Sequence, residues 1–280
     1  MPTVDLDAAT IHYESTGPDT GRPVVFVHGY AMGGSLWEPL ATRLAARGLR
    51  CLAPTWPLGA HPTPLRPGAD PTLPGVAATV GAFLEALDLT DVVLVGNDTG
   101  GLVAQLVAVH HGERLGALVL TSCDAFEHFP PPILRPFIVA ARYPAAFRAA
   151  VRTLSSTLVR RWAYGSLAHR DVEPLAAQWV RPALDDPAVA EDLRRLTASL
   201  ERRTSLDVAA RLGEFTRPAL VAWSAEDAVF PVGDAQRLAD ALPGATLRLV
   251  PGARTFAMLD QPDVLAEAVA GLAVPAGSRG

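Results

Sequence analysis

Short apolar runs alternate with segments of helical periodicity over most of this 280-residue chain. The runs predict strands at 10–14, 23–27, 49–53, 92–95, 115–120, 218–223 and 245–250. Helical spacing of apolar residues predicts helices at about 35–48, 74–87, around 102–107, 232–242 and 262–272. Strands that alternate with helices indicate an α/β fold, a mostly parallel sheet flanked by helices on both faces.

The alternation stops between about 125 and 205. This stretch is rich in Ala, Arg, Leu and aromatic residues and is interrupted by prolines, which predicts several short helices. We therefore expect a helical cap at 125–205, inserted into a core domain made of 1–124 and 206–280. The Pro- and Gly-rich segment 54–74 is expected to be a surface loop, and the tail at 275–280 to be disordered.

A sharp turn is expected at Gly96-Asn97-Asp98-Thr99-Gly100, between the strand at 92–95 and the next helix. Small residues on both sides allow a strained turn that pushes one side chain into a cleft. The pentapeptide fits the frame G-x-S-x-G of a nucleophile elbow, with aspartate at the apex. The alternative is an ordinary strand–helix turn in which Asn97 and Asp98 cap the helix.

Several further motifs agree with this elbow. They are His28-Gly29 after an early strand, Gly-x-Asp-x-Gly-Gly at the elbow, Asp227 after the strand ending at Trp223, and Asp260-Gln261-Pro262 before the last helix. With them the layout resembles the α/β-hydrolase superfamily over nearly the whole chain. The aspartate at the apex is most similar to the branch of epoxide hydrolases and haloalkane dehalogenases. The resemblance implies an α/β-hydrolase fold with a cap, and an enzyme that acts on a small, largely apolar organic molecule.

In that branch an aspartate attacks a saturated carbon to form an alkyl ester, and a histidine activates the water that hydrolyses the ester. The resemblance assigns the nucleophile to Asp98 and the supporting acid to Asp227. It assigns the oxyanion hole to the amides of Tyr30 and Thr99. Asp124 is a second candidate for the acid, although it could also cap the first cap helix, and Asp227 could equally be a turn residue.

The triad histidine is missing. It should follow Asp227, but the last histidine of the chain is His169. Thr255 occupies the expected position, and a threonine hydroxyl can only hydrogen-bond Asp98 or a substrate. His28, His128 and His169 are therefore considered as substitute bases, with His28 more typical of a structural residue.

The other histidines are expected away from the site. His12 and His61 are predicted at the surface, and His110 and His111 at the end of the elbow helix. Thr99 stands where dehalogenases commonly carry a tryptophan that holds halide, which weakens that resemblance.

We expect aromatic and polar side chains to line an apolar pocket above Asp98. Tyr143 and Tyr164 are the cap residues that match the acidic tyrosines of epoxide hydrolases. The candidate substrate-binding residues are His28, Trp37, Asp124, Phe126, Phe129, Tyr143, Tyr164 and Phe256. Further cap aromatics, Phe137, Phe147, Trp162 and Trp179, belong either to the cap core or to the pocket wall.

Composition narrows the function classes. The net charge of −5 argues against nucleic acid and against an anionic membrane surface as partners. We see no signal peptide, no apolar run long enough to span a bilayer, and no metal-ligand or cofactor motif. Cys51 and Cys123 are expected to be buried in or beside core strands. The sequence thus predicts a cytoplasmic, cofactor-independent enzyme with a small-molecule substrate, either a monomer or a homodimer.

Three functions remain open. The first, which the family resemblance favours, is a hydrolase with an incomplete triad; it would need a base other than the missing histidine. The second is a non-hydrolytic enzyme, a lyase, isomerase or cyclase, in which Asp98 is a general acid/base with its pKa raised by an apolar cap. The third is a catalytically inactive binding protein. A base within reach of Asp98 would favour the hydrolase. A closed, dry site that contains Asp98 alone would favour the non-hydrolytic enzyme, and a blocked elbow would favour the inactive binding protein.

Overall fold

The computed structural model describes residues 1–273, so the tail expected to be disordered at 275–280 lies outside the described residues. Eight strands form one sheet in the order β1-β2-β4-β3-β5-β6-β7-β8. Their bounds are β1 Thr3–Asp5, β2 Thr10–Thr16, β3 Pro23–Val27, β4 Arg50–Thr55, β5 Val92–Asp98, β6 Leu115–Cys123, β7 Ala219–Ser224 and β8 Ala245–Val250. In this order, β1 pairs with β2 and β2 with β4 in antiparallel orientation. All the other neighbouring strands, including β3, pair in parallel. The predicted mostly parallel sheet is confirmed.

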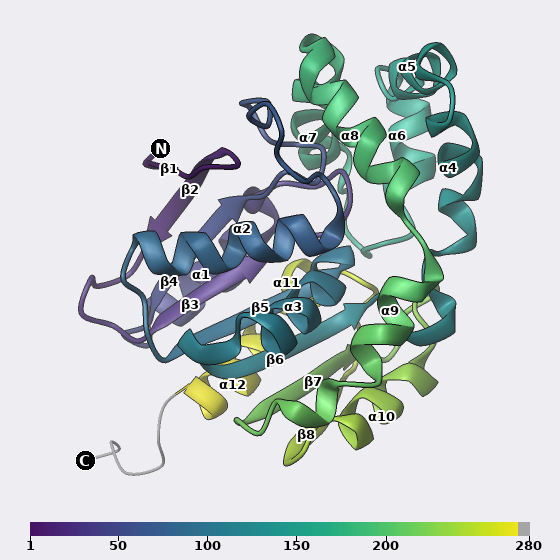
Figure 1. Ribbon diagram of the computed structural model, residues 1–280. Coiled ribbons are helices and arrows are strands. Elements are labelled where there is room, and N and C mark those ends of the chain that lie inside the picture. The colour runs from purple at the N-terminus through teal and green to yellow at the C-terminus, as the bar shows by residue number, and fades with distance from the viewer. Residues whose placement is uncertain (274–280) are drawn as a thin grey trace.

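Helices cover both faces of this sheet (Figure 1). The core helices are α1 Glu38–Ala45, α2 Leu73–Ala86, α3 Thr99–His110, α10 Val232–Ala241, α11 Ala257–Asp260 and α12 Pro262–Ala273. Two separate apolar clusters show the layers: α2, α3 and α10 contribute to one, and α1, α11 and α12 to the other. The helix expected at 35–48 is divided, because a 3-10 turn at Gly34–Trp37 precedes α1.

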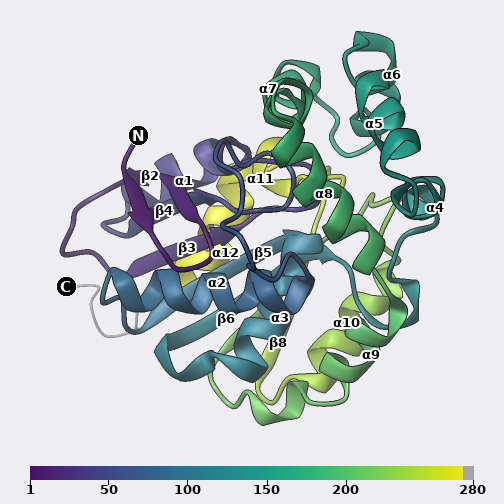
Figure 2. The same ribbon diagram turned by 45° about the horizontal axis from the view of Figure 1, so that its top comes forward.

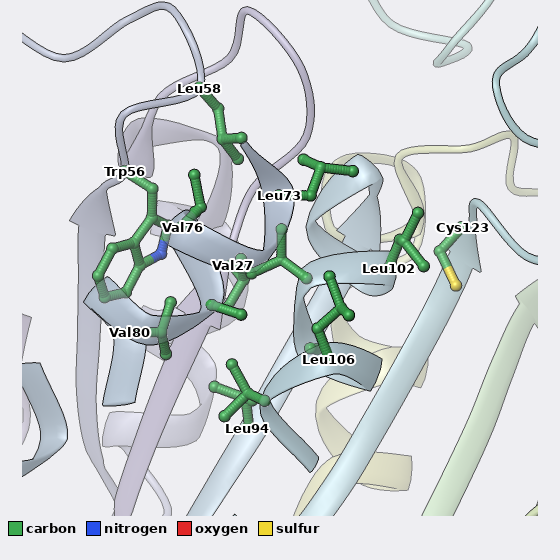
Figure 3. Close-up of a cluster of buried hydrophobic side chains, with 14 of the residues drawn as sticks. Val27, Trp56, Leu58, Leu73, Val76, Val80, Leu94, Leu102, Leu106 and Cys123 are labelled. Atoms are coloured by element: carbon green, nitrogen blue, oxygen red, sulfur yellow. The ribbon is translucent and has the colours of Figure 1, made fainter. Parts of the chain in front are cut away.

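The packing on one face holds the elbow in place (Figure 3). Val27 of β3 and Leu94 of β5 lie beneath α2 and α3, which contribute Val80 and Leu106 to the same cluster. All four side chains are at most 4% exposed. Because burying each such side chain stabilises the fold by about 1.5–3 kcal/mol, the junction between β5 and α3 is rigidly supported.

Between β6 and β7 the chain forms only helices and turns. They are α4 Arg135–Ala141, α5 Pro144–Thr153, α6 Thr157–Tyr164, α7 Glu173–Asp185, α8 Pro187–Ser199 and α9 Arg202–Ala209, with short 3-10 turns before α4. In both views α4 to α8 stand together beyond the carboxyl ends of the central strands (Figures 1 and 2). By contrast, α9 contacts α3, and its buried residues are Ser205 and Val208. No helix of the described part is long and apolar enough to cross a membrane.

Candidate active site

Asp98 is the last residue of β5 and sits at a strained turn. Its backbone has φ 55° and ψ −136°, a combination that is unusual for a residue other than glycine. The flanking glycines make room for the turn: a Cβ at Gly96 would lie 2.6 Å from the carbonyl oxygen of Gly100. A Cβ at Gly100 would lie 2.2 Å from the carbonyl oxygen of Val27. The small residues on both sides are thus required for this conformation.

Two backbone amides hold one oxygen of the Asp98 carboxylate. Oδ1 accepts hydrogen bonds from the amide of Thr99 at 2.6 Å and from the amide of Tyr30 at 3.1 Å. A Cβ at Gly29 would lie 2.2 Å from the same oxygen, so the loop approaches closely only because that residue is glycine. Asp98 therefore caps α3 and also lies in the wall of the cavity described below. Its other carboxylate oxygen, Oδ2, accepts neither of these two hydrogen bonds.

Burial controls the charge of this carboxylate. It raises the pKa of Asp98 from 3.8 to about 6, although the hydrogen bonds from Thr99 and Tyr30 act in the opposite direction. Asp124, which is 2% exposed, accepts a hydrogen bond at Oδ2 from the Thr99 hydroxyl at 2.8 Å. Burial and the nearby Asp98 charge hold the pKa of Asp124 well above its ordinary value. The negative charge of Asp98 thus disfavours ionisation of Asp124.

Asp124 does not have the capping role that was its alternative. The 3-10 turn that follows it has Ala125 at its N-cap and no side-chain capping hydrogen bond. The backbone amide of Asp124 instead donates to the carbonyl oxygen of Asp98 at 3.2 Å. The ends of β5 and β6 are thereby tied together at the site.

Above Asp98 lies an apolar cavity of about 120 Å³. Its wall is formed by Tyr30, Ala31, Met32, Asp98, Thr99, Pro131, Ile133, Leu134, Phe137, Phe147, Val151, Leu154, Trp162, Ala163, Tyr164, Ser166, Leu167, Leu193 and Val229. Most of these residues come from the helices between β6 and β7, so these helices roof the site. The volume is close to that of an apolar cavity of about 150 Å³ that binds benzene. The arrangement suits a small, largely apolar molecule.

The hydroxyl groups of the two tyrosines in the wall are already engaged. Tyr164 donates to the carbonyl oxygen of Ala31 at 2.9 Å. The Tyr30 hydroxyl lies 2.6 Å from Oγ1 of Thr197, which itself donates to Leu193, so Tyr30 is the donor in that pair. Burial raises the pKa of both tyrosines, which keeps them protonated.

Thr255 lies beside Asp227, but neither residue reaches the cavity wall. The Thr255 hydroxyl donates to Oδ1 of Asp227 at 3.1 Å, and the threonine is fully buried. The same Oδ1 accepts from the amides of Val229 at 2.8 Å and Phe230 at 2.9 Å. Asp227 therefore organises the turn after β7, from which Val229 contributes to the cavity wall.

None of the seven histidines, all of them among the described residues, lines the cavity. In His28, Nε2 accepts from the amide of Trp56 at 2.8 Å, and Nδ1 is 3.0 Å from the carbonyl oxygen of Gly29. Burial lowers the pKa of His28 to about 4, so its ring is neutral and structural at pH 7.

The other two candidates for a substitute base, His128 and His169, each lie beside an acidic residue outside the cavity wall. His128 lies 2.6 Å from Asp234, and His169 lies 2.9 Å from Glu226. His61, predicted at the surface, is instead buried 3.4 Å from Asp192. The surface prediction for His61 is wrong because its loop folds under the cap.

Seven of the eight predicted substrate-binding residues lie outside the cavity wall, which corrects those expectations. Only Tyr164 lies in the wall; His28 and Asp124 are described above. Trp37 stacks on Phe26 with ring centroids 4.9 Å apart, and Phe256 packs edge-on against Trp179. Phe129 is 1% exposed in the core.

The other two are Phe126, which is 9% exposed, and Tyr143. The guanidinium of Arg237 sits 3.9 Å from the ring centre of Phe126. Tyr143 is 65% exposed just before α5, so it cannot act as an acid toward Asp98.

The sequence analysis missed the aliphatic part of the wall. These residues are Met32, Leu134, Val151, Leu154, Leu167 and Leu193. Met32 lies in the loop after β3, and the other five lie between β6 and β7. For these five the signal is apolar spacing, which does not distinguish a wall residue from a residue of the cap core. No group of His, Cys, Asp or Glu side chains within residues 1–273 has the geometry to hold a metal ion, and both cysteines are buried and free.

Comparison with known proteins agrees with this architecture. Residues 24–268 match the model of a family described as "Alpha/beta hydrolase family". Haloalkane dehalogenase 2 of Mycobacterium tuberculosis is 28% identical over 271 residues, covering 95% of this chain and 92% of that protein. The non-heme chloroperoxidase CPO-A1 of Kitasatospora aureofaciens is 27% identical over 252 residues, covering 88% of each chain.

Solved structures show the same fold. An alpha/beta hydrolase fold protein from Burkholderia ambifaria superposes with a TM-score of 0.80 at 23% identity over 96% of each chain. The ancestral haloalkane dehalogenase AncHLD2 superposes with a TM-score of 0.78 at 21% identity over 97% of each chain.

Proposed function

This chain belongs to the alpha/beta hydrolase family, and from that premise we propose that Asp98 transfers protons to and from a small, largely apolar organic molecule. The reaction class is elimination, isomerisation or cyclisation, without a covalent ester. One observation carries the proposal: Asp98 is the only carboxylate in the cavity wall, and no histidine, lysine or arginine of the described residues joins it there.

The environment of Asp98 suits proton transfer. A general base works best when its pKa lies near the operating pH, and burial brings the pKa of Asp98 to about 6. The amides of Thr99 and Tyr30 fix the orientation of the carboxylate before substrate binds. The apolar wall excludes water, so a proton taken from the substrate stays available for return.

The two-step ester mechanism has less support. Its second step needs a base that deprotonates water, and such help is typically worth ~10²–10⁴-fold in rate. Thr255 cannot supply it, because its hydroxyl donates to Asp227 away from the cavity. An ester formed on Asp98 would therefore persist.

A hydrolase that uses an Asp98 ester is the second candidate. The two amides on Oδ1 would stabilise the negative charge that develops on this oxygen when water attacks an ester. The similarity to haloalkane dehalogenase 2 points in the same direction.

A deuterium-exchange screen tests the proposal. The protein is incubated in deuterium oxide with a panel of small apolar carbonyl compounds, and in parallel with haloalkanes and epoxides. We expect incorporation of deuterium into at least one carbonyl compound, abolished in Asp98→Asn and retained in Asp227→Asn. Multiple turnover of a haloalkane or epoxide, lost in Asp98→Asn and without exchange in any carbonyl compound, would support the hydrolase instead.

A further inference from the structure

The charge of the chain is unevenly distributed. Between Glu127 and Asp171 the sequence contains no acidic residue but seven arginines, although the whole chain has a net charge of −5. Arg160 is buried and paired with Glu173. The exposed arginines of this segment are Arg135, Arg142, Arg148, Arg152, Arg161 and Arg170. Apart from Arg161, none of these six forms an ion pair with a described residue.

Large apolar side chains are exposed on the same segment. They are Ile133, Val139, Tyr143, Leu158 and Trp162, with exposed fractions of 45–77%. Contiguous exposed apolar groups on a folded protein mark a surface that binds something. The five tryptophans of the chain all lie among the described residues, and only Trp162 is exposed.

Arginine and apolar residues share helix faces here. On α4, Arg135, Val139 and Arg142 are spaced by one and two turns, so they lie on one face. On α6, Leu158 and Trp162 are one turn apart, with Arg161 beside them. The helices α4, α5 and α6 group at one outer corner of the molecule in both views (Figures 1 and 2). We name this surface the arginine–apolar rim.

The rim reaches the cavity at two of its residues. Ile133 and Trp162 are both exposed to solvent and part of the cavity wall, and they come from opposite ends of the segment. A molecule that enters between them passes directly from the rim into the apolar space above Asp98. The rim is thus placed where an apolar substrate would arrive.

We propose that the arginine–apolar rim docks on an anionic lipid surface, from which apolar substrate enters the cavity. Arginines that alternate with Trp and Leu on one helical face are the composition of helices that lie in a lipid interface. Six exposed arginines, five of them without an ion-pair partner among the described residues, complement anionic headgroups. The net charge of the whole chain argued against a membrane partner. Docking depends instead on the local charge of the rim, which is positive. The proposal does not depend on the reaction at Asp98.

Vesicle binding tests the charge component. We expect the protein to bind vesicles of equal parts phosphatidylcholine and phosphatidylglycerol at low salt, much more weakly at high salt, and weakly to phosphatidylcholine alone. Each arginine near such a surface is worth about fivefold in affinity, so Arg135→Gln with Arg142→Gln should weaken binding by about 25-fold. The matched control Arg203→Gln, on α9 outside the rim, should leave binding unchanged.

The apolar component has its own control. Leu158→Ala should weaken vesicle binding, whereas Leu249→Ala on β8, which is 47% exposed and outside the rim, should not. Unchanged melting temperatures of the variants exclude misfolding as the cause. Equal binding to neutral and anionic vesicles, or equal losses for rim and control variants, would overturn the proposal.

Fluorescence locates the contact. Because the other four tryptophans are buried, brominated anionic lipid should quench Trp162 and shift its emission to the blue, and Trp162→Phe should abolish this signal. Vesicle binding without quenching would contradict docking through the rim. Binding of soluble polyglutamate, with the same blue shift and no binding of vesicles, would identify an acidic protein as the partner and refute the lipid surface.

Discussion

Asp98 combines a strained backbone, two amide donors to one oxygen, and burial that raises its pKa to about 6. Strain and an unfavourable charge both cost stability, and such costs concentrate at functional sites. The elbow, its two amides and the close approach of Gly29 follow from local backbone geometry. The motif therefore predicted the elbow, and the family resemblance assigned the two amides, whereas the close approach of Gly29 was not predicted.

Replacement of Asp98 should stabilise the protein at neutral pH. The carboxyl has an ordinary pKa of 3.8 and a folded pKa of about 6, so between these pH values the folded state binds more protons than the unfolded state. Stability is therefore lost as pH rises through this window, by about 3 kcal/mol at most. We expect Asp98→Asn to be more stable than wild type at pH 8 and equal to it near pH 3, measured by urea unfolding at both pH values. A variant that is less stable at pH 8 would contradict the pKa shift.

The Thr99 hydroxyl should tune the pH dependence of Asp98. It donates to Asp124 and also lowers the pKa of Asp98, so its removal should raise that pKa. Because Asp98 must be ionised to accept a proton, activity should rise with pH through about 6. In Thr99→Val the midpoint should move to higher pH and stability should fall by about 1–3 kcal/mol, since Asp124 loses its donor. Thr99→Ser keeps the hydroxyl and should resemble wild type; identical profiles for both variants would exclude this role.

At the scale of elements, the strands were predicted because they are continuous apolar runs buried on both faces. The strands β5 and β6 extend beyond their apolar runs to Asp98 and Cys123, because these polar ends still pair with each other. The strand β1 was missed, since it is three residues long and mostly exposed at the edge of the sheet. The residues of the cavity wall were harder to predict than the strands. Tyr143 and Tyr164 are both cap tyrosines, yet Tyr143 is exposed and Tyr164 lies in the cavity wall.

The loop after β7 should behave as a structural element. Asp227 accepts three hydrogen bonds there and does not face the cavity. Asp227→Ala should lower stability by about 1–3 kcal/mol, because buried donors lose their acceptor. The pH midpoint of activity should change little, because Asp227 has only a weak influence on Asp98. A midpoint displaced by more than that of Thr99→Val would show that Asp227 belongs to the proton-transfer machinery.

At the scale of the whole molecule, the chemistry and the entrance lie on the same side. Asp98 at the carboxyl end of β5 lies in the floor of the cavity, together with residues of the loop after β3, and residues between β6 and β7 form its roof and its exposed rim. Figure 2 shows α4 to α8 beyond the carboxyl ends of the central strands. The rim could not be recognised from net charge or composition, because both average over the chain. It requires knowledge of which arginines and apolar residues the fold leaves exposed.

Turnover should therefore depend on how the substrate is presented. We expect an apolar substrate dissolved in anionic vesicles to be consumed faster than the same substrate in neutral vesicles. High salt should remove the difference, because it screens the arginines of the rim. A rate that does not depend on salt and is equal in both vesicle types would show that the rim has no role in substrate uptake.

The central claim is that Asp98 moves protons and does not turn over a covalent ester. The most direct measurement is the mass of the peptide that contains Asp98 after incubation with haloalkanes and epoxides in oxygen-18 water. In the ester mechanism water attacks the carboxyl carbon, so repeated turnover leaves oxygen-18 in the Asp98 carboxylate. We predict no oxygen-18 in this peptide, whether it is unmodified or carries a persistent adduct. Labelling of Asp98 that increases with product formation would contradict the account.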